Sequence, residues 1–187
     1  MDFKVLNREK LYAGKVFDLI VDEIEYASGN RAIREVAAHP GGAAILALFP
    51  DDRIILVKQF RYPLGKSIYE LPAGKLGENE DPMLCAAREL AEETGYKAEN
   101  WKRLTAIYTS PGFCTEQLHI FLATELARAD GGQTLEEGEQ SLTVKIVPLS
   151  RAIEMIEREE IVDGKTICGI FLGERVVREN RSLQESP

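Results

Sequence analysis

One stretch of this 187-residue chain decides its fold: Gly74–Gly95, with the sequence GKLGENEDPMLCAARELAEETG. Its second half predicts a helix over residues 82–94. Asp81 suits the N-cap, and Pro82 suits the first helical position, where the backbone N–H that proline lacks would have no helical partner. Gly95 suits the C-terminal end, because glycine readily adopts the left-handed conformation found there. The first half predicts a loop that leads into the helix.

The predicted helix carries three carboxylates on one side. At ~100° per residue, they fall within one narrow arc: Glu89, Glu92 and Glu93. The apolar residues expected to be buried lie roughly opposite: Leu84, Ala87 and Ala91. Arg88 can pair with Glu92, whereas no basic residue of the helix is placed to relieve Glu89 and Glu93. The pattern alone is typical of a solvated acidic face, but it also suits Mg²⁺, which prefers carboxylate oxygens and water.

The spacing of the glycines and charged residues decides between these interpretations. Gly74 is followed by five residues, Glu80, seven residues and the run RELAEETG at 88–95. This arrangement resembles the Nudix box, the metal-binding signature of the Nudix hydrolases, at every charged and glycine position. Tyr96 departs from the aliphatic residue that usually ends the box, at a packing position that leaves the metal ligands undisturbed.

Strand and helix patterns are mixed along the rest of the chain. Apolar or β-branched runs predict strands at 15–21, 31–37, 44–49, 53–62, 68–71, 104–109, 118–123 and 143–147. Two further helices are predicted at 151–160, capped by Ser150, and at 166–178. Turns at 28–30 and 50–52 indicate hairpins. These elements predict an α/β fold, a Nudix α/β/α sandwich with a mixed sheet, plus a small N-terminal antiparallel β region.

The change of pattern near residue 42 divides the chain. Residues 1–42 are expected to form the N-terminal β region, and residues 43–187 the Nudix hydrolase domain. A hairpin alone is marginally stable, so this region is expected to pack on something such as a second subunit. The resemblance implies a homodimer in which the region also contacts the base of the substrate.

Composition excludes several other classes of protein. A net charge of −8 argues against sequence-independent nucleic-acid binding. No apolar run approaches the ~20 residues of a membrane span, and the polar N-terminus is not that of a secretory signal. Three cysteines in no pair motif, Cys85, Cys114 and Cys168, indicate free thiols in a reducing cytoplasm. With only two histidines, a metal is expected to bind among oxygens.

Three features beyond the box resemble the ADP-ribose pyrophosphatase branch of the family. Leu71-Pro72-Ala73 precedes the box, and Glu136-Glu137-Gly138-Glu139 lies in a glycine-rich loop before a strand. Pro111, in Ser110-Pro111-Gly112-Phe113, stands sixteen residues after Gly95, where proline marks ADP-ribose preference in the family. Without the resemblance, the Glu-rich loop could equally be an exposed acidic turn.

The resemblance implies a metal site and a catalytic set. The metal ligands would be the carboxylates of Glu89, Glu93 and Glu139 and the carbonyl of Ala73. The catalytic residues would be Glu137, Glu92 and Arg88, with Glu137 as the general base on the attacking water. Arg88 would hold Glu80 or Glu92 in place. The cofactor would be Mg²⁺, with Mn²⁺ as a possible substitute.

The resemblance also implies substrate contacts. Arg61 would contact the diphosphate or ribose, Glu116 the ribose, and Lys75 would contribute a backbone contact; Pro111 and Gly112 belong to the same binding region. Phe17 and Arg34 fall where relatives sandwich the adenine. From the residues alone, Arg61 could instead be an ordinary strand-end arginine and Phe17 a hydrophobic strand residue.

The predicted reaction is metal-dependent hydrolysis of the diphosphate of ADP-ribose to AMP and ribose 5-phosphate. Another nucleoside diphosphate sugar, such as GDP-mannose, is the alternative substrate. A non-catalytic nucleotide-sensing Nudix module is a third reading, although all glutamates of the box are present. The expected partner is a small molecule, with neither nucleic acid nor membrane involved.

Overall fold

The computed structural model describes residues 2–135 and 137–184, and the chain forms two compact units. Unit 1 comprises residues 1–41 and 108–117, and unit 2 comprises residues 42–107 and 118–187. None of the helices in the described part of the chain has the length and apolar character needed to span a lipid bilayer.

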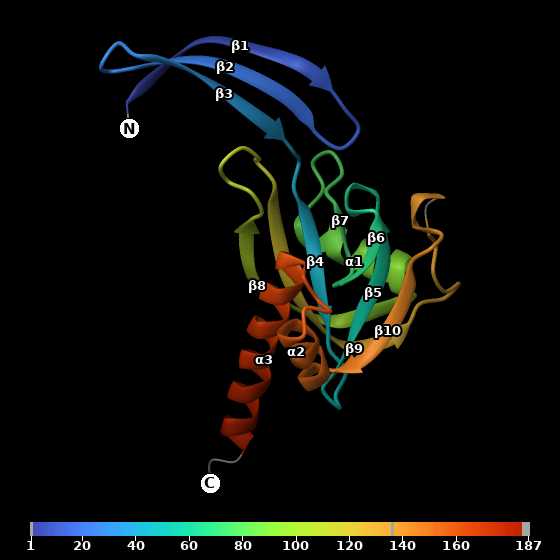
Figure 1. The fold of residues 1–187 in the computed structure, drawn as a ribbon. Helices are drawn as coiled ribbons and strands as arrows, with labels where there is room; N and C mark the ends of the chain where they lie inside the picture. The colour runs from blue at the N-terminus through green and yellow to red at the C-terminus, as the bar shows by residue number, and fades with distance from the viewer. Residues whose placement is uncertain (1, 136, 185–187) are drawn as a thin grey trace. The chain divides into compact units, whose positions relative to one another are not determined.

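Unit 1 is built on an antiparallel sheet of three strands, drawn in blue in Figure 1. Its strands are β1 (Phe3–Ala13), β2 (Asp18–Tyr26) and β3 (Arg31–Ala38). The predicted hairpin corresponds to β2 and β3, with Gly29 in the turn at φ +84°. The sequence did not predict β1, because its polar and charged residues show no regular alternation with apolar ones.

Unit 2 contains seven strands in two sheets. β4 (Gly42–Ala47), β7 (Ala73–Lys75), β8 (Tyr96–Tyr108) and β9 (Gln117–Arg128) form one sheet in the order β7-β4-β9-β8. β5 (Arg53–Arg61), β6 (Lys66–Glu70) and β10 (Thr143–Pro148) form the other in the order β10-β5-β6. β4 runs parallel to β9 and antiparallel to β7, so the sheet is mixed as predicted.

Three helices cover the strands of unit 2: α1 (Pro82–Thr94), α2 (Leu149–Glu157) and α3 (Gly164–Gln184). Alternate residues of β4 serve two separate cores, since Ile45 packs with Leu90 of α1 and Leu46 packs with Met155 of α2 and Ile170 of α3. The strands therefore lie between α1 on one side and α2 with α3 on the other, which confirms the α/β/α sandwich (Figure 1).

Several predicted boundaries were wrong. α2 begins at Leu149 with Pro148 at its N-cap, so Ser150 lies inside the helix and does not cap it. α3 extends beyond the predicted 166–178 at both ends, and β8 begins at Tyr96, well before residue 104. Two short 3₁₀ turns, Tyr62–Leu64 and Glu137–Glu139, were not predicted.

We expect Gly173→Ala to lower the free energy of unfolding by ~1–3 kcal/mol, the usual range for overpacking a core. A Cβ at Gly173 would lie 1.9 Å from Cδ2 of Leu46, so α3 or β4 would have to shift. Gly164→Ala in the same helix meets nothing within 4 Å and is the matched control. Urea unfolding of both variants measures the difference, and equal stabilities would contradict this account of α3 packing.

Candidate active site

Two glutamates of helix α1, Glu89 and Glu93, lie on its buried side. Asp81 caps the helix by accepting a hydrogen bond from Met83 N at 2.8 Å, and Gly95 ends it at φ +69°, as predicted. The buried positions of the helix are Cys85, Ala86, Glu89, Leu90, Glu93 and Thr94. The predicted apolar face was wrong, because Leu84 is 59% exposed while Glu89 and Glu93 are 7% and 1% exposed. Small side chains and carboxylates together form the face that packs on the sheet.

Strand β7, which precedes the helix, approaches these carboxylates closely. The backbone N–H of Ala73 donates to Oε2 of Glu93 at 2.9 Å. Gly74 lies so close to Glu89 that a Cβ there would be 1.9 Å from the carboxylate carbon. Glycine is therefore required at position 74 by close approach of a side chain, since any larger residue would displace Glu89.

The protein environment disfavours the charged forms of both carboxylates. Burial raises the pKa of Glu93 to about 8, assisted by the negative charges of Glu89 and Glu139 and opposed by the Ala73 N–H. Burial also raises the pKa of Glu89, although the neighbouring Arg88 guanidinium opposes this effect. Buried carboxylates normally carry a paired charge, so a site that holds two of them together with Glu139 calls for a cation.

Arg88 connects the loop to the helix. Its guanidinium donates to Glu80 from Nε at 3.0 Å and from Nη2 at 3.1 Å, and to Glu92 from Nη1 at 3.0 Å, as predicted. It also donates to Oε1 of Glu89 at 2.6 Å, which corrects the prediction that Glu89 has no basic partner in the helix. The hydrogen bonds from Arg88 and from Gly77 N hold the pKa of Glu80 at about 2. The Lys75 carbonyl accepts a further bond from Arg88.

The acidic loop lies against the C-terminal end of α1. Gln133 donates to the Glu93 carbonyl at 2.6 Å, and the backbone N–H of Thr134 donates to the Glu92 carbonyl at 2.9 Å. Glu139 is half-buried, and its charge acts on both Glu89 and Glu93, whereas Glu137 is exposed. Glu136 lies outside the described residues.

These residues fit a hard divalent cation. The expected donors are all oxygens, from Glu89, Glu93, Glu139 and the Ala73 carbonyl, which is the donor type that Mg²⁺ and Mn²⁺ favour. Within residues 2–135 and 137–184, no group of three or more acidic, histidine or cysteine side chains is already arranged to hold a metal ion. Arg88 and the Ala73 N–H instead hold Glu89 and Glu93 in place. The free thiol of Cys85 has its pKa raised by burial to about 12, so it is not a competing ligand.

Arg61 binds the buried carboxylate of Glu70, an interaction that the sequence did not predict. Its Nε and Nη2 donate to the two oxygens of Glu70 at 2.6 and 2.7 Å, and Lys165 of α3 binds the same carboxylate. Lys165 also lies 3.1 Å from Asp163. Burial acts to raise the pKa of Glu70, but the Arg61 and Lys165 interactions outweigh it and hold the pKa below its ordinary value. One signal was available in the sequence. Glu70 lies two residues after the apolar Ile68 in the same strand and therefore shares its core-facing side.

The other substrate residues expected from the sequence belong to unit 1. Phe17 lies between β1 and β2, outside any strand, and its side chain is exposed. Arg34 is exposed on β3, where it donates to the Ile33 carbonyl at 2.9 Å and contacts the Tyr26 hydroxyl. Pro111 and Gly112 are exposed, and Glu116 is held by the Thr109 hydroxyl at 2.7 Å.

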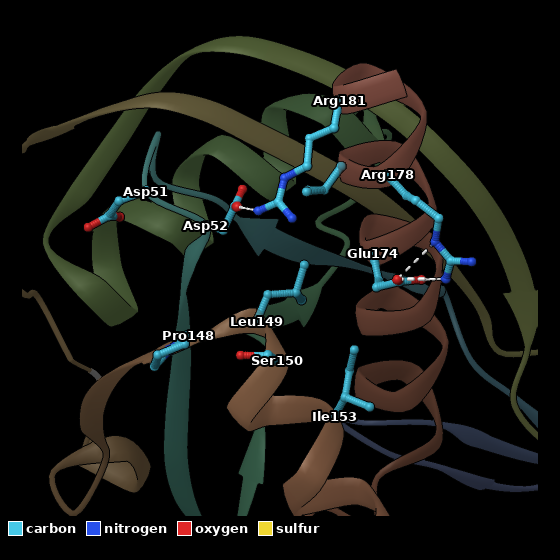
Figure 2. A pocket seen from close by; sticks show the side chains of 10 residues that line it. Asp51, Asp52, Pro148, Leu149, Ser150, Ile153, Glu174, Arg178 and Arg181 are labelled. Atoms are coloured by element: carbon cyan, nitrogen blue, oxygen red, sulfur yellow. Dashed lines mark hydrogen bonds and ion pairs between the residues drawn. The ribbon is translucent and has the colours of Figure 1, made fainter. Parts of the chain in front are cut away.

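A groove of about 410 Å³ lies elsewhere on unit 2, between α2, α3 and the β4–β5 turn (Figure 2). Figure 2 shows both arginines of the groove paired with carboxylates, Arg178 with Glu174 at 2.6 Å and Arg181 with Asp52. None of the residues expected to bind metal or substrate lines this groove. The residues expected to bind metal and substrate thus lie outside this groove.

Comparison with known proteins identifies the family. The sequence model of the NUDIX domain matches residues 38–168. The chain is 44% identical to an ADP-ribose pyrophosphatase of Bacillus subtilis over 91% of each chain. It is 36% identical to a GDP-mannose pyrophosphatase of Escherichia coli O1:K1 over 87% of this chain and 90% of that one. A crystal structure of an ADP compounds hydrolase superposes with a TM-score of 0.81 over 96% of each chain at 20% identity, which supports the fold.

The chain belongs to the Nudix family and is a Nudix hydrolase. Within that family it resembles the ADP-ribose pyrophosphatases, which confirms the branch predicted from the sequence. Nudix hydrolases generally depend on a divalent metal, in agreement with the two buried carboxylates of α1.

We expect Glu70→Gln to lower the free energy of unfolding at pH 7 by roughly 3 kcal/mol, because Arg61 and Lys165 lose their buried counter-charge. The pKa of Glu70 is lowered in the folded state. Its contribution is therefore present above the unfolded pKa near ~4.3 and disappears as the pH falls through the lower folded value. Urea unfolding at several pH values should show the wild type and the variant converging in acid. The exposed Glu99→Gln is the control, and a difference independent of pH would refute the role of Glu70 charge.

Proposed function

We propose that this chain hydrolyses the diphosphate of ADP-ribose to AMP and ribose 5-phosphate, using Mg²⁺ or, as a substitute, Mn²⁺. One observation carries the proposal: Glu89 and Glu93 are buried together on α1, and the pKa of Glu93 is raised to about 8. Buried carboxylates of this kind gain a charge partner when a divalent cation binds. The similarity to the Bacillus ADP-ribose pyrophosphatase supports the choice of substrate.

The residues of the chain would divide the reaction between them. Glu89, Glu93, Glu139 and the Ala73 carbonyl would hold the cation. When bound, it would offset the charge of the diphosphate and lower the pKa of water. The water oxygen forms a new bond to phosphorus, the bond from that phosphorus to the bridging oxygen breaks, and Glu137 accepts the proton of the water. Arg88 keeps Glu80, Glu89 and Glu92 oriented, as its hydrogen bonds indicate.

Each unit carries residues that are proposed for recognition of the substrate. In unit 2, the Arg61 side chain and the backbone of Lys75 are proposed to bind the diphosphate or ribose. In unit 1, Pro111, Gly112 and Glu116 are proposed for the ribose, and Phe17 with Arg34 for the adenine. The side chains of Phe17 and Arg34 are both exposed and therefore accessible to a base.

GDP-mannose is the alternative substrate, supported by the similarity to the Escherichia coli GDP-mannose pyrophosphatase. The greater identity to an ADP-ribose pyrophosphatase and the presence of Pro111 favour ADP-ribose. Both substrates would use the same chemistry at phosphorus, so the choice between them lies with the residues that contact the sugar and base.

We also propose that residues 1–42 mediate a homodimer, whereas residues 43–187 form the catalytic domain. The three-stranded sheet of unit 1 has β1 as an edge strand of eleven residues. Large apolar side chains are exposed along this sheet: Phe3, Val5, Leu11, Tyr12 and Ile33. A long edge strand with exposed apolar residues normally pairs or is covered, and a second copy would cover it.

A cytoplasmic location is proposed from the cysteines. Cys85, Cys114 and Cys168 are all free thiols, and unpaired cysteines are typical of reducing compartments. Cell fractionation would check this, and enrichment in a secreted or membrane fraction would contradict it.

The substrate proposal is tested by kcat/KM for ADP-ribose, GDP-mannose, UDP-glucose and diadenosine polyphosphates with Mg²⁺. We expect ADP-ribose to be the preferred substrate. Glu93→Gln should lower kcat/KM by about 100-fold or more, the scale on which metal sites respond to lost contacts, while Glu99→Gln should be unaffected. Absence of turnover for all four substrates would contradict the proposed hydrolase activity. A fully active Glu93→Gln variant would refute the proposal that Glu93 is a metal ligand.

The dimer is tested by sedimentation velocity at micromolar concentration. We expect a species of twice the chain mass of 20.9 kDa. Val5→Glu, which places a charge on an exposed apolar site of β1, should shift it to monomer. Lys4→Glu changes the adjacent residue on the opposite face of the same strand and should leave the dimer intact. A monomeric wild type would rule out the proposal.

A further inference from the structure

Glu70 is a buried carboxylate for which the Nudix box provides no role. Its side chain is among the most buried in the chain, yet it is bound by two cationic side chains from different elements. Arg61 ends β5, and Lys165 belongs to the first turn of α3, where its side chain is only 10% exposed. A buried carboxylate with two cationic partners is costly to desolvate, and Glu70 lies only three residues before Ala73, whose N–H binds Glu93.

The hydrogen bonds of Arg61 leave one edge of its guanidinium available. Glu70 accepts from Nε and Nη2, and within the described residues no protein group accepts from Nη1. The side chain remains 39% exposed. Arg61 and Glu93 influence each other electrostatically, and the N–H that binds Glu93 belongs to Ala73, three residues after Glu70. The two N–H groups of Nη1 therefore remain able to donate to an anion.

The first turn of α3 also binds the segment between β6 and β7. Asp163 accepts from the backbone N–H of Thr166 at 3.0 Å and from its hydroxyl at 2.6 Å. Thr166 Oγ1 in turn accepts from the backbone N–H of Leu71 at 2.8 Å. Leu71 leads through Pro72 to Ala73, whose N–H holds Glu93. Lys165 and Thr166 are consecutive residues of α3: Lys165 contacts the carboxylate that binds Arg61, and Thr166 binds the segment that leads into β7.

We propose that Lys165 is a positioning residue, which through Glu70 holds Arg61 with Nη1 directed at the diphosphate of the substrate. This inference rests on the proposed function. Lys165 binds Oε2 of Glu70, the same oxygen that accepts from Nη2 of Arg61. Without Lys165, Oε2 of Glu70 would lose one of its two cationic partners, and the carboxylate that holds Arg61 would be less firmly fixed. A fixed guanidinium loses less conformational entropy when the diphosphate binds.

The test compares Lys165→Met with Lys102→Met, which removes an equal charge from an exposed position of unit 2. We expect Lys165→Met to lower kcat/KM for ADP-ribose by roughly tenfold, mainly through KM, with Lys102→Met unchanged. Lys165→Arg should recover most of the loss. In an Arg61→Met background, Lys165→Met should add little, because Lys165 acts through Arg61.

Wild-type kinetics for Lys165→Met would overturn the proposal, as would a loss that multiplies fully with that of Arg61→Met. If Lys165→Met does not fold, as judged by circular dichroism, the same cycle is run with Lys165→Gln. A wild type inactive on every nucleoside diphosphate would defeat the proposed function instead. Binding of inorganic pyrophosphate by calorimetry then decides the positioning role, and equal affinities of wild type and Lys165→Met would refute it.

Discussion

The burial of two glutamates of α1 against the sheet is the constraint on which the rest of unit 2 depends. Glu89 and Glu93 occupy helix positions that would ordinarily carry apolar side chains. Their burial raises both pKa values, and the surrounding structure compensates in specific ways. Gly74 has no side chain that would clash with Glu89. The Ala73 N–H binds Glu93, and Arg88 binds Glu89.

The two layers of helices support this arrangement from opposite sides. α1 supplies the carboxylates, and the first turn of α3 reaches the strand ends that face them. Because Lys165 and Thr166 are adjacent, a shift of this turn would disturb both the Glu70 carboxylate that binds Arg61 and the segment that leads into β7. Close packing of Gly173 on Leu46 keeps α3 near β4 and so helps to fix the position of the turn.

The sequence predicted the fold class, the helix of the Nudix box and the family, because spacing and capping residues are local properties. It predicted the wrong buried face for α1, since a helical wheel assumes that carboxylates face solvent and leucines face the core. Leu84 and Glu93 reverse that assumption. The interaction of Glu70 with Lys165 was also not predicted, because the two residues are 95 positions apart and have no pattern that links them.

By itself, the sequence from Gly74 to Gly95 determined that this chain is a Nudix hydrolase, since the order and spacing of its glycines and charged residues require no knowledge of packing. The tertiary structure alone decided which carboxylates are buried and which charges accompany them. Glu93 acquires its raised pKa from the strands packed over it. Arg61 binds Glu70 through one edge of its guanidinium, and a lysine of a distant helix contacts the same carboxylate. Desolvation and orientation arise only when separate segments meet.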